Sequence, residues 1–206
     1  MLISTFIGLV ESCCFSKSFL ILRRVRSTRL EGRRNGPPGS SLSCSTESTY
    51  MQPKVRTCLG FKDEAEEAAR FYVSVIPDSI FEGAFRREPS GPAILVSFTL
   101  AGTPYQALNM GCDTNRNEAC SISVMTKDQR ETDELWEKLL ANGGAEIQCS
   151  WLKDRYGVRW QIVPEALPRM FMDEDRAAAA RAFQAMLGMV KIDLAKVEAA
   201  FRGESA

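Results

Sequence analysis

Hydrophobic and polar positions follow regular periods through residues 54–110. An alternating, largely apolar run at Lys54–Phe61 predicts a strand. Helical spacing of apolar positions from Ala65 to Tyr72 then predicts an amphipathic helix, which Asp63 is placed to cap. Three more strands, separated by Pro- and Gly-containing breakers, are expected at Ser79–Arg87, Ala93–Leu100 and Thr103–Met110.

The same order of patterns begins again at residue 119. Ala119–Thr126 predicts a strand, Asp128 repeats the cap, and Leu135 and Leu139 repeat the apolar stripe of a helix. Residues 145–163 supply the closing strands. The chain is therefore expected to be an α+β protein that contains one strand–helix–strands unit twice, with a cleft between the two copies.

The closing stretch Gln148–Val163 predicts two strands joined by a tight turn at Asp154–Gly157. Side chains of a strand alternate between the two faces of a sheet, so the apolar positions up to Ile162 would pack on helices. Arg159 and Gln161 fall on the other face. Such side chains suit a ligand-lined concavity, and the alternative is a half-buried strand with a solvated outer face.

The two ends of the chain differ in composition from its body. Residues 1–52 are rich in Arg, Ser, Gly and Pro, and we expect a disordered or mis-annotated extension ahead of Met51, with an organelle transit peptide as the alternative. Residues 53–166 form the predicted paired-module domain. Residues 167–206 are expected to be a helical extension, in which Asp173 would cap the longest helix.

The charge of the chain limits its partners. The formal net charge of the 206 residues is zero, but residues 1–50 carry seven basic and three acidic side chains, which leaves a net charge of −4 on the remainder. A weakly acidic body argues against nucleic acid as a partner. No apolar run approaches the roughly 20 residues that span a bilayer, so no membrane partner is expected.

The residue types that are scarce limit the chemistry. The chain has no histidine, the commonest metal ligand and the usual general base at neutral pH. Its seven cysteines contain no Cys-x-x-Cys pair, and we expect buried free thiols in a reducing compartment, hence a cytoplasmic location.

Five blocks of the sequence carry a resemblance to a known family. They are Ala65–Tyr72 (AEEAARFY), Phe98–Asn109 (FTLAGTPYQALN), Asn117–Val124 (NEACSISV), Gln148–Pro164 (QCSWLKDRYGVRWQIVP) and Gln184–Asp193 (QAMLGMVKID). In these blocks the chain resembles the PhnB-like proteins of the vicinal oxygen chelate superfamily, which includes glyoxalase I and bleomycin-resistance proteins. The resemblance implies paired βαβββ modules around a concave cleft and a homodimer.

Metalloenzymes of this superfamily hold a divalent ion with four ligands of His, Glu or Gln type. The resemblance places Thr57 and Ser121 at the two strand-start positions and Gln161 at a ligand position of the last strand. The equivalent in the first module is ambiguous between Gln106 and Asn109. Hydroxyl and amide oxygens are weak ligands without a charged partner, so we expect no catalytic metal and no cofactor.

The resemblance implies a protein of the glyoxalase/bleomycin-resistance type that binds a small molecule, and the uncharged ligand positions predict that it is metal-free. Its expected ligand-binding residues are Thr57, Asn109, Ser121, Arg159 and Gln161. One alternative is an enzyme of the same superfamily with metal- or water-mediated chemistry on a small oxygenated substrate, and another is a structural dimer with a degenerate cleft. Relatives also carry a 3-demethylubiquinone methyltransferase label, but the chain lacks the glycine-rich strand-to-helix turn of a nucleotide-like cofactor site.

Overall fold

The computed structural model describes residues 53–204, so the prediction for residues 1–52 lies outside the described part. Two modules with the same order of elements follow one another. The first module contains β1 (Thr57–Phe61), α2 (Ala65–Val75), β2 (Ile80–Arg86), β3 (Ala93–Leu100) and β4 (Thr103–Asn109). The second contains β5 (Ile122–Thr126), α3 (Gln129–Leu140), β6 (Ala145–Ile147), β7 (Trp151–Lys153) and β8 (Arg159–Pro164).

Each module folds into its own four-stranded mixed sheet. The strand order is β1-β4-β3-β2 in the first sheet and β5-β8-β7-β6 in the second. In both sheets the first strand is parallel to the last, and the remaining neighbours are antiparallel. The structure thus confirms the predicted α+β class and the repeated βαβββ unit.

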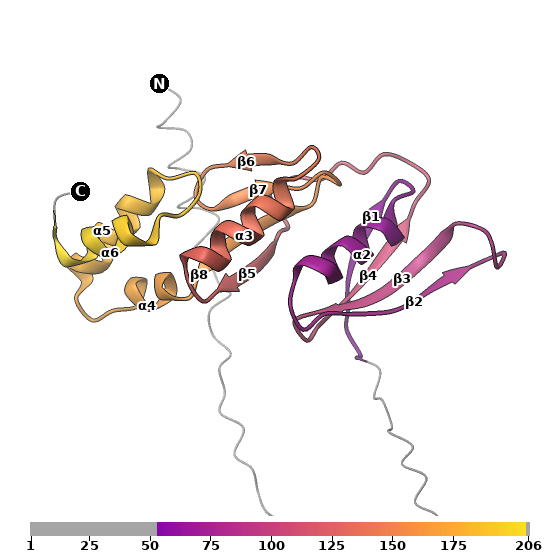
Figure 1. Ribbon diagram of the computed structural model, residues 1–206, viewed down its shortest axis with the longest axis horizontal. Coiled ribbons are helices and arrows are strands. Elements are labelled where there is room, and N and C mark those ends of the chain that lie inside the picture. The colour runs from indigo at the N-terminus through magenta and orange to yellow at the C-terminus, as the bar shows by residue number, and fades with distance from the viewer. Residues whose placement is uncertain (1–52, 205–206) are drawn as a thin grey trace, which may run out of the picture. The chain divides into compact units, whose positions relative to one another are not determined.

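Each sheet has one face covered by the helix of its own module. Figure 1 shows α2 lying along the first sheet and α3 along the second. We call these covered sides the helix faces and the opposite sides the open faces. Val96 and Ala107 are fully buried on the first helix face, as are Leu152, Trp160 and Ile162 on the second. Period-two alternation leaves half-buried or exposed side chains on the open faces.

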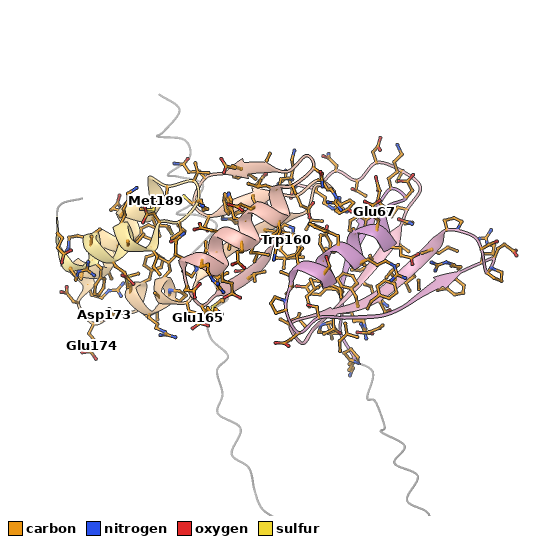
Figure 2. The ribbon with its side chains drawn as sticks, viewed as in Figure 1. Glu67, Trp160, Glu165, Asp173, Glu174 and Met189 are labelled. Carbon is orange, nitrogen blue, oxygen red and sulfur yellow. The ribbon has the colours of Figure 1, made fainter. Side chains whose placement is uncertain are left out.

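The stretch before β7 differs from the expected continuous strand. Cys149 and Ser150 both have positive φ, 61° and 66°, so β6 and β7 are separated by a sharp turn. L-residues adopt this left-handed conformation at a cost. Backbone carbonyls of the C-terminal segment hold the turn in place, because Met189 (labelled in Figure 2) accepts from Cys149 N at 2.9 Å and Val190 accepts from Ser150 N at 2.8 Å.

The predicted helix caps are confirmed in one case and wrong in two. Asp128 caps α3 by accepting a hydrogen bond from Glu131 N at 2.8 Å. Asp63 does not cap α2, whose first residue is preceded by Glu64 without a side-chain cap. Asp173 lies too early, since Asp175 caps α5. In both wrong cases the helix begins one or two residues after the start that the apolar pattern predicts.

Three helices follow the second sheet and pack on one another. They are α4 (Ala166–Phe171), α5 (Arg176–Leu187) and α6 (Leu194–Arg202). Their shared core contains Leu167, Ala182, Ile192 and Val197, all nearly or fully buried. Within residues 53–204, no helix is long and apolar enough to cross a bilayer.

The expectation of buried thiols is wrong for three cysteines of the described part. Cys58, Cys112 and Cys120 are exposed and Cys149 is half-buried, all as free thiols. Cys58 is exposed because alternation along β1 places Leu59, rather than its neighbour, on the helix face. Cysteine burial in strand-like sequence therefore depends on the phase of the alternation.

A buried carboxylate connects the two modules. Asp154, in the turn between β7 and β8, is 1% exposed and accepts four hydrogen bonds. Tyr72 of α2 donates through its hydroxyl at 2.8 Å, Trp160 (labelled in Figure 2) donates through Nε1 at 2.8 Å, and the backbone N–H groups of Tyr156 and Val158 donate at 2.9 Å each. Burial raises the pKa of Asp154, while these four donors favour the ionised form.

Loss of the Tyr72 hydroxyl is expected to destabilise the fold. Tyr72→Phe removes one donor to a buried charge and should lower the free energy of unfolding by about 1.5–3 kcal/mol. Tyr156→Phe is the matched control, because its hydroxyl donates to the exposed Glu67 and should cost about 1 kcal/mol or less. Denaturant unfolding of both variants measures the difference, and equal losses would contradict a special role for the buried contact.

Candidate functional site

The open face of the second sheet brings two predicted site residues together. Gln161 of β8 donates through Nε2 to Oγ of Ser121, which lies just before β5, at 2.7 Å. Both side chains are half-exposed. Ser123 and Trp151 flank Gln161 in the sheet register and share its face. This face therefore presents an amide and a hydroxyl that carry no fixed charge.

Arg159 adds a cation to the same face. Its guanidinium donates to one oxygen of Glu118 through Nε at 3.2 Å and Nη2 at 3.1 Å, and to the carbonyl of Gly157 through Nη1 at 3.0 Å. The Arg159 side chain is only 14% exposed, whereas that of Glu118 is 62% exposed. The guanidinium is thus mostly buried and bonded to the backbone of the turn, whereas its acidic partner is exposed to solvent.

Lys153 lies directly opposite Arg159 in the β7–β8 register and on the same face. Its ammonium group makes no ion pair or hydrogen bond with any residue between 53 and 204. A hollow of about 330 Å³ adjoins these two cations. We call it the linker hollow, since residues 113–116 between the modules form one of its walls.

The sheet registers show which residue of the first module corresponds to Gln161. Thr57 pairs with Tyr105 at the start of the β1–β4 ladder, and Ile122 pairs with Trp160 at the start of the β5–β8 ladder. One step further, Cys58 pairs with Gln106, as Ser123 pairs with Gln161. The ambiguity left by the sequence is therefore resolved in favour of Gln106, on the open face of the first sheet.

Asn109 has a different set of contacts. Its Oδ1 accepts from Ala65 N, the first residue of α2, at 2.9 Å. Its Nδ2 donates to the carbonyls of Asp63 at 3.0 Å and Ala93 at 2.9 Å. The side chain thus supplies the helix cap that Asp63 does not, and its amide is occupied by backbone groups.

Thr57 stands apart from Ser121 and Gln161. Alternation along β1 places it on the same side as Leu59 and Phe61, the helix face, where it is exposed only because it begins the strand. Among the described residues, no hydrogen bond joins Thr57 to Ser121 or Gln161. The local sequence match was one residue out of phase, and Cys58 is the β1 residue that faces the open side.

The open face of the first sheet is closed by an internal ion pair. Arg56, just before β1, binds both carboxylate oxygens of Glu82 at 3.1 and 2.7 Å. Their side chains are 9% and 14% exposed, and Thr99 also donates to Glu82. The first open face therefore satisfies its own charges, whereas the second leaves Lys153 without a counter-charge among the described residues.

The donor groups do not fit the divalent metal of the superfamily's metalloenzymes. The two open faces place Cys58, Gln106, Ser123 and Gln161 at the paired positions, a set with two amides, a hydroxyl and a thiol. Divalent ions in proteins are bound by imidazoles, thiolates or ionised carboxylates. Within residues 53–204, no three His, Cys, Asp or Glu side chains cluster closely enough to hold a metal ion. The expected absence of a metal remains a prediction.

Two functional candidates escaped the sequence analysis. Lys153 lies six residues before Arg159, and the hairpin turn at Asp154–Gly157 would have placed both on one face. Arg116 lies in an irregular segment, where no periodicity indicates direction. The first could have been found from the register of the hairpin, and the second could not.

The family model described as 3-demethylubiquinone-9 3-methyltransferase matches residues 53–163. No curated protein matches the chain. Among solved structures, a putative 3-demethylubiquinone-9 3-methyltransferase, the PhnB protein from Bacillus cereus, is 29% identical, with 54% of this chain and 99% of that chain covered and a TM-score of 0.49.

Two other solved structures are more distant. The fosfomycin resistance protein FosX from Listeria monocytogenes is 14% identical, with 60% of this chain and 99% of that chain covered and a TM-score of 0.45. A glyoxalase/bleomycin resistance protein from Albidiferax ferrireducens T118 is 11% identical, with 53% and 96% covered and a TM-score of 0.40.

Substitutions at Asn109 and Gln106 should separate a structural amide from an open-face amide. Asn109→Ala leaves the N-terminus of α2 uncapped and two carbonyls unpaired, so we expect a loss of about 1–3 kcal/mol in the free energy of unfolding. Gln106→Ala removes a side chain that makes no side-chain hydrogen bond within residues 53–204, and it should change stability by about 0.5 kcal/mol or less. Equal stability of the two variants in denaturant unfolding would contradict the structural role of Asn109.

Proposed function

Because its residues 53–163 match the family model, this chain belongs to the family described as 3-demethylubiquinone-9 3-methyltransferase, and we propose that it binds a small molecule. The match confirms the family label that the resemblance of the sequence blocks predicts. The proposed mode is that of a glyoxalase/bleomycin-resistance type protein, without a metal ion. The ligand would lie on the open face of the second sheet.

The observation that carries this proposal is the Gln161–Ser121 pair, which shares a strand face with Arg159, a residue that lines the linker hollow. The amide and the hydroxyl are half-exposed on an uncovered face, and their mutual hydrogen bond of 2.7 Å fixes the orientation of both. Each retains donor and acceptor capacity for a ligand. A hollow of about 330 Å³ is within the size range of small-molecule sites.

Methyl transfer, which the family description names, has no support from these residues. A nucleotide-like cofactor is held at a glycine-rich turn between a strand and the following helix. Residues 62–64 connect β1 to α2, and residues 127–128 connect β5 to α3. Neither connection contains a glycine, and both are too short to wrap a cofactor's phosphates. The open face of the second sheet is therefore the proposed ligand site, and methyl transfer is not proposed.

We also propose a homodimer. The open faces carry large apolar side chains that are exposed in the single chain: Phe85 is 62% exposed, Ile80 57% and Met125 61%. Large apolar side chains exposed on a sheet face favour a protein–protein interface when they form one patch. A second copy of the chain would be the partner, as the family resemblance implies.

The dimer is tested by light scattering of the purified protein. The expected mass is twice that of the 22.9 kDa chain, and Phe85→Asp should shift it toward the monomer because a buried unpaired charge opposes association. Val190→Asp, at an exposed apolar position outside the open faces, is the control. A monomeric wild-type protein at high concentration would refute the proposal.

The binding function is tested by a thermal-shift screen against a panel of neutral and anionic metabolites. A ligand present at about 100 times its dissociation constant adds about 2.7 kcal/mol of stability. Gln161→Ala should weaken binding of the strongest ligand by about tenfold, as expected for the loss of one or two hydrogen bonds. Gln184→Ala, at an exposed position on α5, is the matched control.

Two results would contradict this proposal. A screen in which no compound stabilises the protein would favour a dimer with a degenerate cleft. Stoichiometric divalent metal in the purified protein, removed by a chelator with loss of ligand binding, would refute the metal-free mode and favour an enzyme of the superfamily.

A further inference from the structure

The linker hollow has an excess of positive charge. It lies between the segment that joins the modules and the turn that precedes β8. Its charged lining consists of four cations, Lys62, Arg116, Lys153 and Arg159, and two carboxylates, Glu64 and Asp113. Four like charges around one hollow repel each other unless an anion lies among them.

Backbone groups fix two of these cations in place. Arg116 donates to the carbonyl of Tyr156 at 2.6 Å and also to the carbonyl of Gly60. Its guanidinium lies 4.5 Å from the centre of the Phe61 ring. Arg159 is fixed by its bond to the Gly157 carbonyl. Neither guanidinium has to be ordered when a ligand arrives, which lowers the entropic cost of binding.

The acidic partners, in contrast, are exposed side chains of the linker. Asp113 is 89% exposed where it pairs with Lys62 at 3.0 Å, and Glu118 is 62% exposed where it pairs with Arg159. Glu118 uses a single oxygen for both of its bonds to Arg159. Exposed pairs of this kind contribute about 0–1 kcal/mol, so a better anion can displace them at little cost.

Lys153 has no such partner within the described residues, although it faces Arg159 across the β7–β8 ladder. Like charges directly opposite in a sheet are destabilising. A ligand oxygen between the two would convert this repulsion into two charge-assisted hydrogen bonds.

We propose that the linker hollow binds a dianionic oxyanion group of the ligand, with Lys153 and Arg159 as its main contacts, and that Glu118 occupies Arg159 until that group displaces it. Arginine offers a planar fork to two oxygens and lysine a point charge, a combination suited to a phosphate-like group. This inference rests on the proposed binding function, because Arg159 borders both the hollow and the Gln161–Ser121 pair.

The probe is inorganic phosphate, titrated by calorimetry into the full chain at constant ionic strength. We expect saturable binding that sulfate competes for and acetate does not. Lys153→Met keeps the length of the side chain and should weaken phosphate binding about tenfold or more, through loss of a charged hydrogen bond. Lys138→Met, at an exposed position on α3, is the control and should leave binding unchanged.

Glu118→Gln gives the sharpest test, because it removes the competing charge without removing a cation. Phosphate should bind this variant several-fold more tightly than the wild type. Unchanged or weaker binding would overturn the displacement by Glu118, and equal effects of Lys153→Met and Lys138→Met would overturn the site. Circular dichroism and the unfolding midpoint verify that each variant is folded.

The outcome is separable from that of the binding function. If phosphate fails to bind while a neutral ligand from the screen still binds in a Gln161-dependent manner, the anion site is refuted and the proposed function stands. If neither binds, both are refuted.

Discussion

The carboxylate of Asp154 is the constraint on which the rest of the structure depends. It is shielded from water, and its four hydrogen bonds come from three parts of the surrounding chain: one from a helix of the first module, one from a strand of the second, and two from the turn itself. A buried charge is tolerated only when it is fully paired. The turn is therefore fixed in position against α2, and this fixes the direction of β8, the strand that follows the turn. The side chains that β8 presents on its open face are positioned by this arrangement.

The two modules contain sheets of the same topology whose open faces differ in charge. The first sheet neutralises its open face with the Arg56–Glu82 pair, which is largely buried and joins the segment before β1 to β2, at the opposite edge of the sheet. The second has at the corresponding place a serine that binds Gln161, next to Arg159, whose acidic partner among the described residues is the exposed Glu118. Symmetry of the backbone thus coexists with asymmetry of charge. This asymmetry is why the proposals place the ligand on the second sheet.

The elements of the fold were predictable because they follow from the spacing of apolar residues and from the Pro and Gly residues between elements. Both are local properties of the sequence. The βαβββ repeat, the Asp128 cap and the outward position of Arg159 and Gln161 all belong to this class. Thr57 and Asn109 were assigned to the site by motif alone, and their side chains show the limit of that approach. A shift of one residue in the alternation along β1 places Thr57 on the helix face. The backbone partners of Asn109 lie up to 46 residues away in the chain. Long-range pairing of this kind leaves no periodic signal.

The left-handed residues before β7 give the C-terminal helices a role beyond covering a surface. Cys149 and Ser150 are held by carbonyls of the segment that joins α5 to α6, and Ser150 in turn accepts from Ile162 of β8 and donates its hydroxyl to the same residue. A shift in the helices would thus reach β8 through one short chain of main-chain contacts. Changes in the length or sequence of that distal segment are therefore expected to shift the open-face side chains of β8 without altering any of those side chains.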